Sequence, residues 1–305
     1  MNVLVATDGS RFGEWGLNWV ATLPFVKSPR VNVLHVLDIA ALRAPFLSQP
    51  VMAGTERFIQ EEIRRMETHS AKTIKEANEE LAALKLKGMV SKEQGAVAPT
   101  ILKRAPKRDG LLVVGSQGLD ALDRFLLGSV STKLIQHATC PVLVVKGKAA
   151  PLQRIALATD GSAASARALA FVLTKFQPDR WAGKGGQLPI HVTVVHVMPL
   201  VKYPGLEQAG HSLIERIVQK YPGLEPASHT LIERTVQKLV KAGFTAEPLY
   251  QFGKPAEEIM KAASTQHADL IVMGAKGLNT IARFLLGSVS TRVVQHADRS
   301  VLVVR

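Results

Sequence analysis

Two stretches of this sequence place glycine and hydroxyl residues at the same spacing. In the first, a Gly-x-x-Gly at 115–118 is followed, after nine residues, by the Gly-Ser pair 128–129, and the same pattern recurs at 274–277 and 287–288. Each stretch begins at the end of an apolar run typical of a buried strand and ends where a helix is predicted to start. The backbone N–H groups at a helix start, together with the helix dipole, favour phosphate. The pattern therefore indicates a phosphate-binding loop.

The residues within each loop suit this chemistry. Gly115 and Gly118 are expected to permit positive φ and a close approach of the backbone to a ligand. Hydroxyl groups near the helix start can bond phosphate or ribose oxygens. These hydroxyls belong to Ser129, Ser131 and Thr132 in the first loop and to Ser288, Ser290 and Thr291 in the second. The alternative is that the glycines serve tight turns and a serine caps the helix. Capping alone does not explain paired glycines and three hydroxyls, so we favour nucleotide binding in at least one loop.

Two aspartates lie in identical ATDGS segments, each at the end of the first predicted strand of its half. Asp8 and Asp160 could accept a hydrogen bond from a ribose hydroxyl or an adenine amine, and an Asx turn or a helix cap is the compatible alternative. The same turn lacks the GxGxxG of dinucleotide-binding folds, and no GxxxxGK[ST] occurs in the chain. The two common phosphate-binding fingerprints are therefore excluded.

The loops belong to a longer repeat. Residues 124–132 and 283–291 both read RFLLGSVST, and 115–145 aligns without a gap to 274–304. The length of 305 residues fits two domains of about 150 residues each. We therefore predict two copies of one domain, at 1–147 and 152–305, joined by the linker KGKAAPL.

Strand-like and helix-like segments alternate in both halves, as in a parallel sheet covered on both faces. The strands predicted for the first half are 2–7, 31–37, 89–94, 111–115 and 142–146, and its helices are 11–25, 55–87, 99–107 and 129–137. The strands predicted for the second half are 154–159, 190–198, 244–250, 270–274 and 301–305, with helices starting near Ser162, Leu206, Pro255 and Ser288. Right-handed crossovers then predict an α/β fold: two doubly wound domains, each a five-stranded parallel sheet in the order 3-2-1-4-5. Its ligand crevice would lie between the turns after the first and fourth strands, which bring Asp8 to Gly115 and Asp160 to Gly274.

Composition limits the other classes of function. The net charge is +13, but the basic residues are spread over both halves without a block of five like charges, and aromatic residues make up only 5%. A nucleic-acid-binding arm or a base-stacking platform is therefore disfavoured. Cys140 is the one cysteine, so no intrachain disulfide can form and a reducing compartment is expected. Without a signal peptide or a membrane-spanning run, the chain is predicted to be cytoplasmic.

The remaining candidate residues and motifs give weaker evidence for a functional site. His35 and His196 occupy equivalent points in the second strand of each half, where a polar tip is favoured over catalysis because no paired carboxylate or nucleophile is evident. Metal-ligand clusters such as HExxH or paired CxxC are absent from the sequence. An 18-residue unit recurs at 203–220 and 221–238. It could supply a helical cover or a partner surface, but a local duplication without chemistry is the favoured interpretation.

The chain resembles a tandem universal stress protein. The resemblance covers both halves nearly end to end and rests on four features: the ATDGS turn, the HV pair ending strand two, the G-2x-G-9x-G-S loop, and the closing PVLVV or SVLVV strand. That loop is the family's ATP-binding signature, so the resemblance implies the ATP-binding branch. It also implies dimerisation through the last strand, which in a fused chain would give an intrachain pseudo-dimer through 142–145 and 301–304, with a homodimer as a further option.

The resemblance assigns roles residue by residue. It implies that Asp8 and Asp160 lie beside the adenosine, and that Val36 and Val197 contact adenine through backbone groups. The residues implied to hold ribose and phosphates are Gly115, Gly118, Gly128, Ser129 and Ser131 in the first half, and Gly274, Gly277, Gly287, Ser288 and Ser290 in the second. The first half departs from the family pattern before strand four, where Pro106 and Gly110 shorten a helix and alter the rim of the site.

The function predicted from the sequence is that of an ATP-binding regulatory protein of the stress response, not an enzyme, with no catalytic residues and no protein metal site. A divalent ion, Mg or Mn, would be held mostly by the phosphates. A slow ATP-hydrolysing or adenylate-forming enzyme on the same fold is one alternative, and a scaffolding protein with empty loops is another. Binding to nucleic acid ranks last.

Overall fold

The computed structural model describes residues 1–44, 53–107, 109–118, 127–180, 189–198, 226–276 and 286–305. The chain divides into two compact units: 1–22 with 27–149 form unit 1, and 23–26 with 150–305 form unit 2. The expected intrachain pseudo-dimer stays a prediction.

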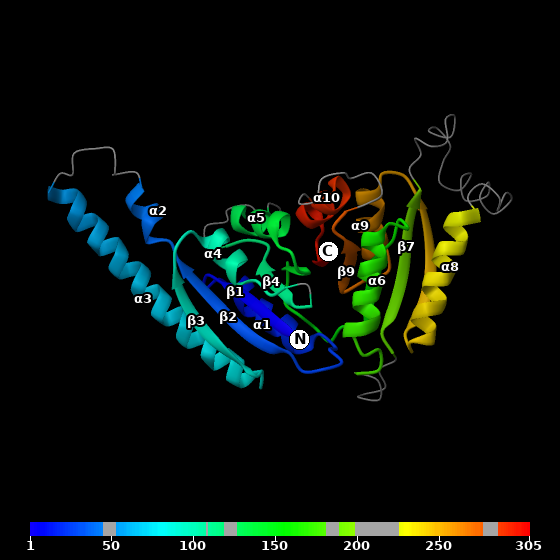
Figure 1. The fold of residues 1–305 in the computed structure, drawn as a ribbon, viewed down its shortest axis with the longest axis horizontal. Helices are drawn as coiled ribbons and strands as arrows, with labels where there is room; N and C mark the ends of the chain where they lie inside the picture. The colour runs from blue at the N-terminus through cyan, green and yellow to red at the C-terminus, as the bar shows by residue number, and fades with distance from the viewer. Residues whose placement is uncertain (45–52, 108, 119–126, 181–188, 199–225, 277–285) are drawn as a thin grey trace. The chain divides into compact units, whose positions relative to one another are not determined.

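Unit 1 is a doubly wound α/β sheet. Its elements are β1 (Asn2–Thr7), α1 (Arg11–Thr22), β2 (Arg30–Leu37), α2 (Ile39–Arg43), α3 (Ala53–Ala83), β3 (Gly88–Gln94), α4 (Val97–Arg104), β4 (Leu111–Gly115), α5 (Ser129–His137) and β5 (Val142–Val145). The strands pair in parallel in the order β3-β2-β1-β4-β5 (Figure 1). The chain winds outward through α1 and α3 and then reverses through α4 and α5. Right-handed crossovers therefore put these two helix pairs on opposite faces, and the helices of each pair contact one another.

Unit 2 repeats the plan. Its elements are β6 (Arg154–Ala158), α6 (Ala163–Lys175), β7 (His191–Met198), α8 (Pro226–Lys241), β8 (Thr245–Phe252), α9 (Pro255–Thr265), β9 (Leu270–Gly274), α10 (Ser288–His296) and β10 (Ser300–Val304). Its strands pair in parallel in the order β8-β7-β6-β9-β10. Counted within each unit, both orders are 3-2-1-4-5, so the predicted fold is confirmed.

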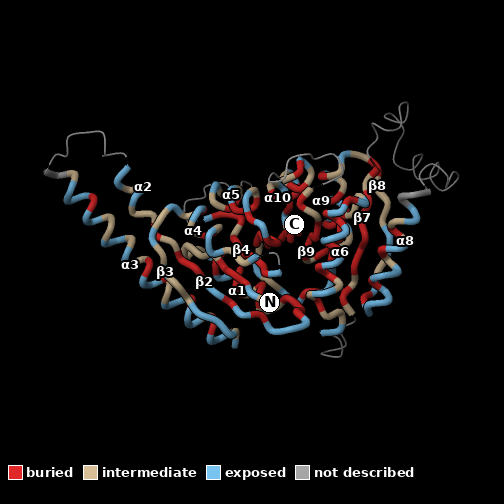
Figure 2. The backbone as a smooth tube through the Cα atoms, in the orientation of Figure 1, coloured by how far each residue is buried: buried red, intermediate tan, exposed pale blue. Residues whose placement is uncertain are grey.

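The core of each unit lies along its central strands. In β4 and β9 every residue before the terminal glycine is buried, and all of β5 and β10 is buried, as the apolar runs LLVVG and LIVMG predicted (Figure 2). The outer strand β3 is exposed or half-buried along its length, as expected at the edge of a sheet.

Several predicted boundaries were wrong for local reasons. Helix α1 ends at Thr22, short of the predicted Phe25, because the residue before Pro24 avoids helical backbone angles. Helix α3 ends at Ala83, short of Lys87, and Lys85 adopts a positive φ of 53° in the turn that follows. The short helix α2, which was not predicted, starts where the Asp38 carboxylate accepts a hydrogen bond from Ala41 N–H at 3.0 Å.

The duplicated 18-residue unit is described only in part. The predicted helix start near Leu206 and the whole first copy, 203–220, lie outside the described residues. The helix of the second copy, α8, is described from Pro226 onward. None of the helices in the described part of the chain combines the length and apolar character needed to cross a bilayer.

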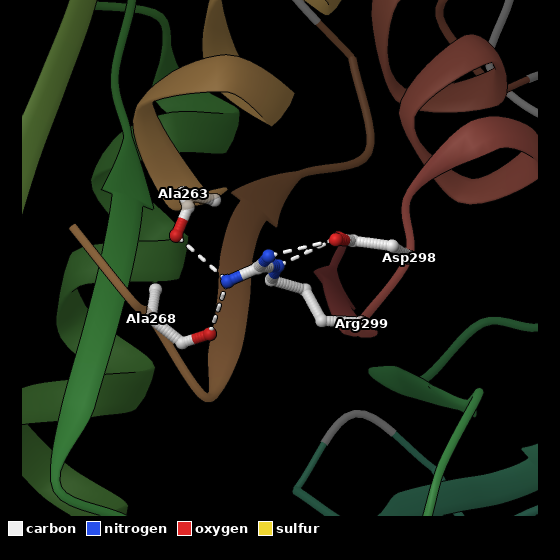
Figure 3. A network of polar contacts seen from close by, with 4 residues as sticks. All are labelled: Ala263, Ala268, Asp298 and Arg299. Carbon is white, nitrogen blue, oxygen red and sulfur yellow. Dashed lines mark hydrogen bonds and ion pairs between the residues drawn. The ribbon is translucent and has the colours of Figure 1, made fainter. Parts of the chain in front are cut away.

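The position of Cys140 is occupied by a different type of residue in unit 2. In unit 1 the Cys140 side chain is fully buried. In unit 2 the aligned residue is Arg299, whose guanidinium donates to the carbonyl oxygens of Ala263 and Ala268, both at 2.7 Å, and pairs with the Asp298 carboxylate (Figure 3). The arginine thus ties the end of α9 and the start of β9 to the loop before β10.

Candidate functional site

The turn after the first strand is built the same way in both units. The Asp8 carboxylate accepts a hydrogen bond from Ser10 N–H at 3.0 Å, and the Asp160 carboxylate accepts one from Ser162 N–H at 3.0 Å. The glycine of each turn has a positive φ, 86° at Gly9 and 78° at Gly161. Both values lie in the left-handed region that favours glycine. The structure therefore contains the Asx turn that the sequence left as an alternative, with one carboxylate oxygen of each aspartate engaged in it.

The glycine loop of unit 1 comes close to this turn. A Cβ placed on Gly118 would lie 2.7 Å from Asp8 Oδ2, and a Cβ on Gly115 would lie 2.6 Å from Phe12 Cβ. Neither Gly115 nor Gly118 has a positive φ, so that part of the prediction is wrong. At Gly115 the neighbouring Phe12 leaves no room for a side chain, and at Gly118 a side chain would displace the Asp8 carboxylate. As predicted, the turns after the first and fourth strands meet.

Helices α5 and α10 begin without a side-chain cap. Gly128 and Gly287 occupy the cap positions with extended backbone, and neither makes a side-chain capping bond within the described residues. A Cβ on Gly128 would have its nearest neighbour, the Ser116 carbonyl oxygen, at 3.5 Å. At α5 the helix start also lines a cavity, and uncapped N–H groups at a helix start are the arrangement that binds anions.

The hydroxyls of the two loops divide into different roles. Ser131 Oγ donates to the Gly115 carbonyl at 2.6 Å, and Ser290 Oγ donates to the Ala275 carbonyl at 2.7 Å. Both serines are buried, so their protons hold the helix against the loop rather than pointing to a ligand. Ser129 and Ser288, at the first position of each helix, are exposed.

In unit 1 these parts surround one cavity of about 640 Å³, a volume typical of small-molecule sites. All seven residues predicted for this half line it: Asp8, Val36, Gly115, Gly118, Gly128, Ser129 and Ser131. Its apolar walls come from both helix layers, with Phe12 on α1 and Met66 on α3 on one side and Val97, Ile101 and Leu134 on the other. The cavity thus combines a long apolar wall with a few polar groups at its ends.

Sequence reasoning missed the contribution of α3. The His69 ring donates from Nε2 to the Asp8 carbonyl at 2.9 Å, and Met66, one turn earlier, also lines the cavity. The charged sequence of α3 shows the periodicity of a helix over 31 residues. That periodicity does not show which residues of the helix contact the loop at Asp8. No spacing signal in the sequence could have identified His69.

His35 reaches the same place from β2. It is 4% exposed, and its Nδ1 lies 3.0 Å from the Thr7 carbonyl oxygen. Burial lowers the pKa of His35, the hydrogen bond to Thr7 opposes that shift, and the nearby His69 adds to it. The ring is therefore neutral at neutral pH, which agrees with the predicted polar tip at the strand end.

Unit 2 keeps the backbone of the site and changes its surroundings. His196 Nδ1 lies 2.8 Å from the Thr159 carbonyl oxygen, as at the equivalent point of unit 1. The side chain facing the turn glycine is different: a Cβ on Gly161 would meet Leu231 of α8 at 2.8 Å, where Gly9 faces His69 and Thr73. The predicted residue Gly277 lies outside the described residues, whereas the other six, Asp160, Val197, Gly274, Gly287, Ser288 and Ser290, are described.

Fold and cavity together define a tandem pair of doubly wound α/β domains, at least one of which has an open crevice at its topological switch point. The sequence model of the universal stress protein family matches residues 1–146 and again 151–305. The chain belongs to the universal stress protein family, and this confirms the resemblance seen in its motifs.

Relatives and solved structures agree. The chain is 30% identical over 312 residues to a universal stress protein of Mycolicibacterium smegmatis, a match that covers 99% of this chain and 96% of the relative. It is 28% identical over 314 residues to one of Mycobacterium tuberculosis, with the same coverage. A crystal structure of a universal stress protein from Archaeoglobus fulgidus matches with a TM-score of 0.62 at 20% identity, covering 100% of this chain and 98% of that one. At that identity the structural match supports the fold alone.

Proposed function

We propose that this universal stress protein is an ATP-binding regulatory protein of the stress response, with a nucleotide site at least in unit 1. The observation that carries the proposal is the cavity of about 640 Å³, because one space joins Asp8, the Val36 strand end and the uncapped start of α5. The universal stress protein membership of both halves supports the same role.

The residues of the cavity suit the parts of a nucleotide in a definite order. Phosphates suit the start of α5, where the first N–H groups are uncapped and Ser129 is exposed. The ribose suits the middle, beside Gly118 and the Asp8 carboxylate, which is an acceptor for hydroxyl protons. The base suits the far end, where Val36 and Leu37 lie at the end of β2.

A divalent ion would be carried by the nucleotide. In the described part of the chain no three His, Cys, Asp or Glu side chains gather as metal ligands. Mg²⁺ in particular binds through phosphate oxygens with few protein ligands. An accompanying Mg or Mn would therefore neutralise phosphate charge without a protein cage.

A regulatory role is favoured over rapid catalysis by where the titratable groups lie. Among the described residues that line the cavity, the titratable side chains are those of Asp8, His35, Asp38 and His69. All four come from the ends of β1 and β2 and from α3, away from the phosphate end at α5. No general base or nucleophile among them is placed to act on a terminal phosphate. Slow hydrolysis or adenylate transfer remains the enzyme alternative.

Two measurements test the proposal. Calorimetric titration of ATP into the purified chain should give saturable heat, and mass spectrometry should identify an adenine nucleotide released from freshly prepared protein. A chain that yields neither heat nor nucleotide contradicts the proposal and favours the scaffolding alternative. Steady phosphate release far above background, lost on Asp8→Ala, would instead favour an enzyme.

A further inference from the structure

We propose that His35 reads the base of the nucleotide in unit 1: its Nε2 accepts a hydrogen bond from an exocyclic amino group, so that the cavity selects adenine over a base with a carbonyl at that edge. The inference rests on the proposed nucleotide site and names the residue that would give that site its base preference.

The first observation is a buried polar atom without a partner. His35 lines the cavity, is 4% exposed, and its Nε2 has no hydrogen-bond partner among the described residues. Buried polar atoms in native proteins nearly always have a partner. An unpartnered nitrogen on a residue that lines a cavity therefore points to a ligand as its partner.

The second observation fixes which kind of partner is needed. The Thr7 carbonyl oxygen, 3.0 Å from His35 Nδ1, can only accept, so Nδ1 carries the ring proton. Burial lowers the pKa of His35; the bond to Thr7 and the Asp8 charge oppose this, and the charges of His69 and Lys92 reinforce it. The neutral ring then presents a lone pair at Nε2. The ligand must supply a donor.

The third observation places the base at this end of the cavity. In the sheet order β3-β2-β1-β4-β5, strand β1 separates β2 from β4, and α5 follows β4 along the chain. A nucleotide whose phosphates occupy the start of α5 crosses the end of β1 and brings its base to the end of β2. Its ribose lies nearer Asp8. The donor available at His35 is therefore on the base, and adenine offers an amino group where hypoxanthine and guanine offer a carbonyl.

The test compares ATP with ITP, which differ at that group of the base. Binding is measured by calorimetry in chains that carry Gly287→Val. This substitution is expected to block the site of unit 2, so the measured heat comes from unit 1 alone. With His35 present, ITP should bind about tenfold or more weakly, because a carbonyl would face the lone pair of Nε2. His35→Asn keeps a donor for the Thr7 carbonyl but has no atom at the position of Nε2. The preference for ATP over ITP, taken as the ratio of their Kd values, should therefore fall about tenfold. His137→Asn, at an exposed residue of α5 outside the cavity, should leave the ratio unchanged.

Each outcome is decisive. An unchanged ATP-to-ITP ratio in His35→Asn, with ATP still bound, overturns the role of His35 and leaves the nucleotide site standing. A change in the ratio of ATP to 2′-deoxy-ATP instead would show that Nε2 accepts from the ribose and overturns base reading. Absence of ATP binding to the parent chain overturns both proposals.

A second measurement needs no variant of His35. In chains carrying ¹⁵N-labelled histidine, saturating ATP should shift the Nε2 resonance of His35, because its lone pair gains a hydrogen bond, and ITP should not shift it in the same direction. An Nε2 resonance that ATP leaves unmoved overturns the proposal even where the His35→Asn chain fails to fold.

Discussion

Replacing Gly128 by valine should abolish nucleotide binding in unit 1 while leaving the fold intact. The backbone angles at Gly128, φ −60° and ψ 152°, are open to any residue and suit a β-branched one. A Cβ there meets Ser116 O at 3.5 Å and Gln117 Cα at 3.7 Å, which are ordinary contacts. We expect the free energy of unfolding to change by less than about 1 kcal/mol. The added methyl groups would occupy the space in front of the first N–H groups of α5.

The size of the binding effect follows from mass action. ATP at about 100 times its Kd stabilises a site by about 2.7 kcal/mol. For a domain of about 150 residues this corresponds to a rise in Tm of roughly 5–10 °C. Gly128→Val should remove the part of the ATP-induced rise in Tm that comes from unit 1. Gly128→Val combined with Gly287→Val should remove the whole rise. The valine at 287 is expected to be tolerated, because the nearest atom to a Cβ there would lie at 3.4 Å.

The assay is thermal unfolding with and without ATP, followed by circular dichroism. Gly147→Val is the matched control, because a Cβ on Gly147 would meet nothing within 4 Å and this residue does not line the cavity. It should keep the full shift. A Gly128→Val, Gly287→Val chain that still melts several degrees higher with ATP would refute the idea that the helix starts hold the phosphates.

Four further outcomes are expected. Gly274→Ala should lower the free energy of unfolding in urea by about 1–3 kcal/mol, because its Cβ would lie 2.5 Å from a backbone carbon of α6. Arg299→Ala should cost about 2–4 kcal/mol through two lost charge-assisted hydrogen bonds, whereas the exposed Arg292→Ala should cost less than about 0.5 kcal/mol. Asp8→Asn keeps the turn oxygen and should preserve stability where Asp8→Ala costs about 1 kcal/mol, and both should weaken ATP binding measured by calorimetry. Because burial lowers the pKa of His35 in the folded chain, the unfolded chain takes up the proton first and stability falls as pH drops below about 6.5; urea midpoints across that range should fall less in His35→Asn.

The sequence predicted the parts of the site whose causes are local. The bounds of β4, β9 and α5 were predicted to the residue, because an apolar run ends at a glycine or a Gly-Ser pair opens a helix. The alternation of strands and helices, with right-handed crossovers, then determined the strand order and hence that the Asp8 turn meets the glycine loop. These inferences needed no knowledge of side-chain packing.

What the sequence could not predict depends on packing between distant elements. His69 contacts the Asp8 turn because of the register of α3 on the sheet, which no local pattern specifies. The reason for glycine at Gly115 was also misjudged: it is the proximity of Phe12, not a left-handed backbone. Likewise, the hydroxyl of Ser131 was predicted to serve a ligand but donates to a carbonyl of its own loop.

The exchange of His69 for Leu231 opposite the turn glycine has a consequence for how this protein can evolve. When two identical subunits assemble, any substitution appears in both sites at once, so a change that benefits one site burdens the other. Fusion of the copies into a single gene product removes that coupling. One half can then retain an ancestral ligand preference while the other drifts toward a different affinity, a different ligand or a purely architectural task.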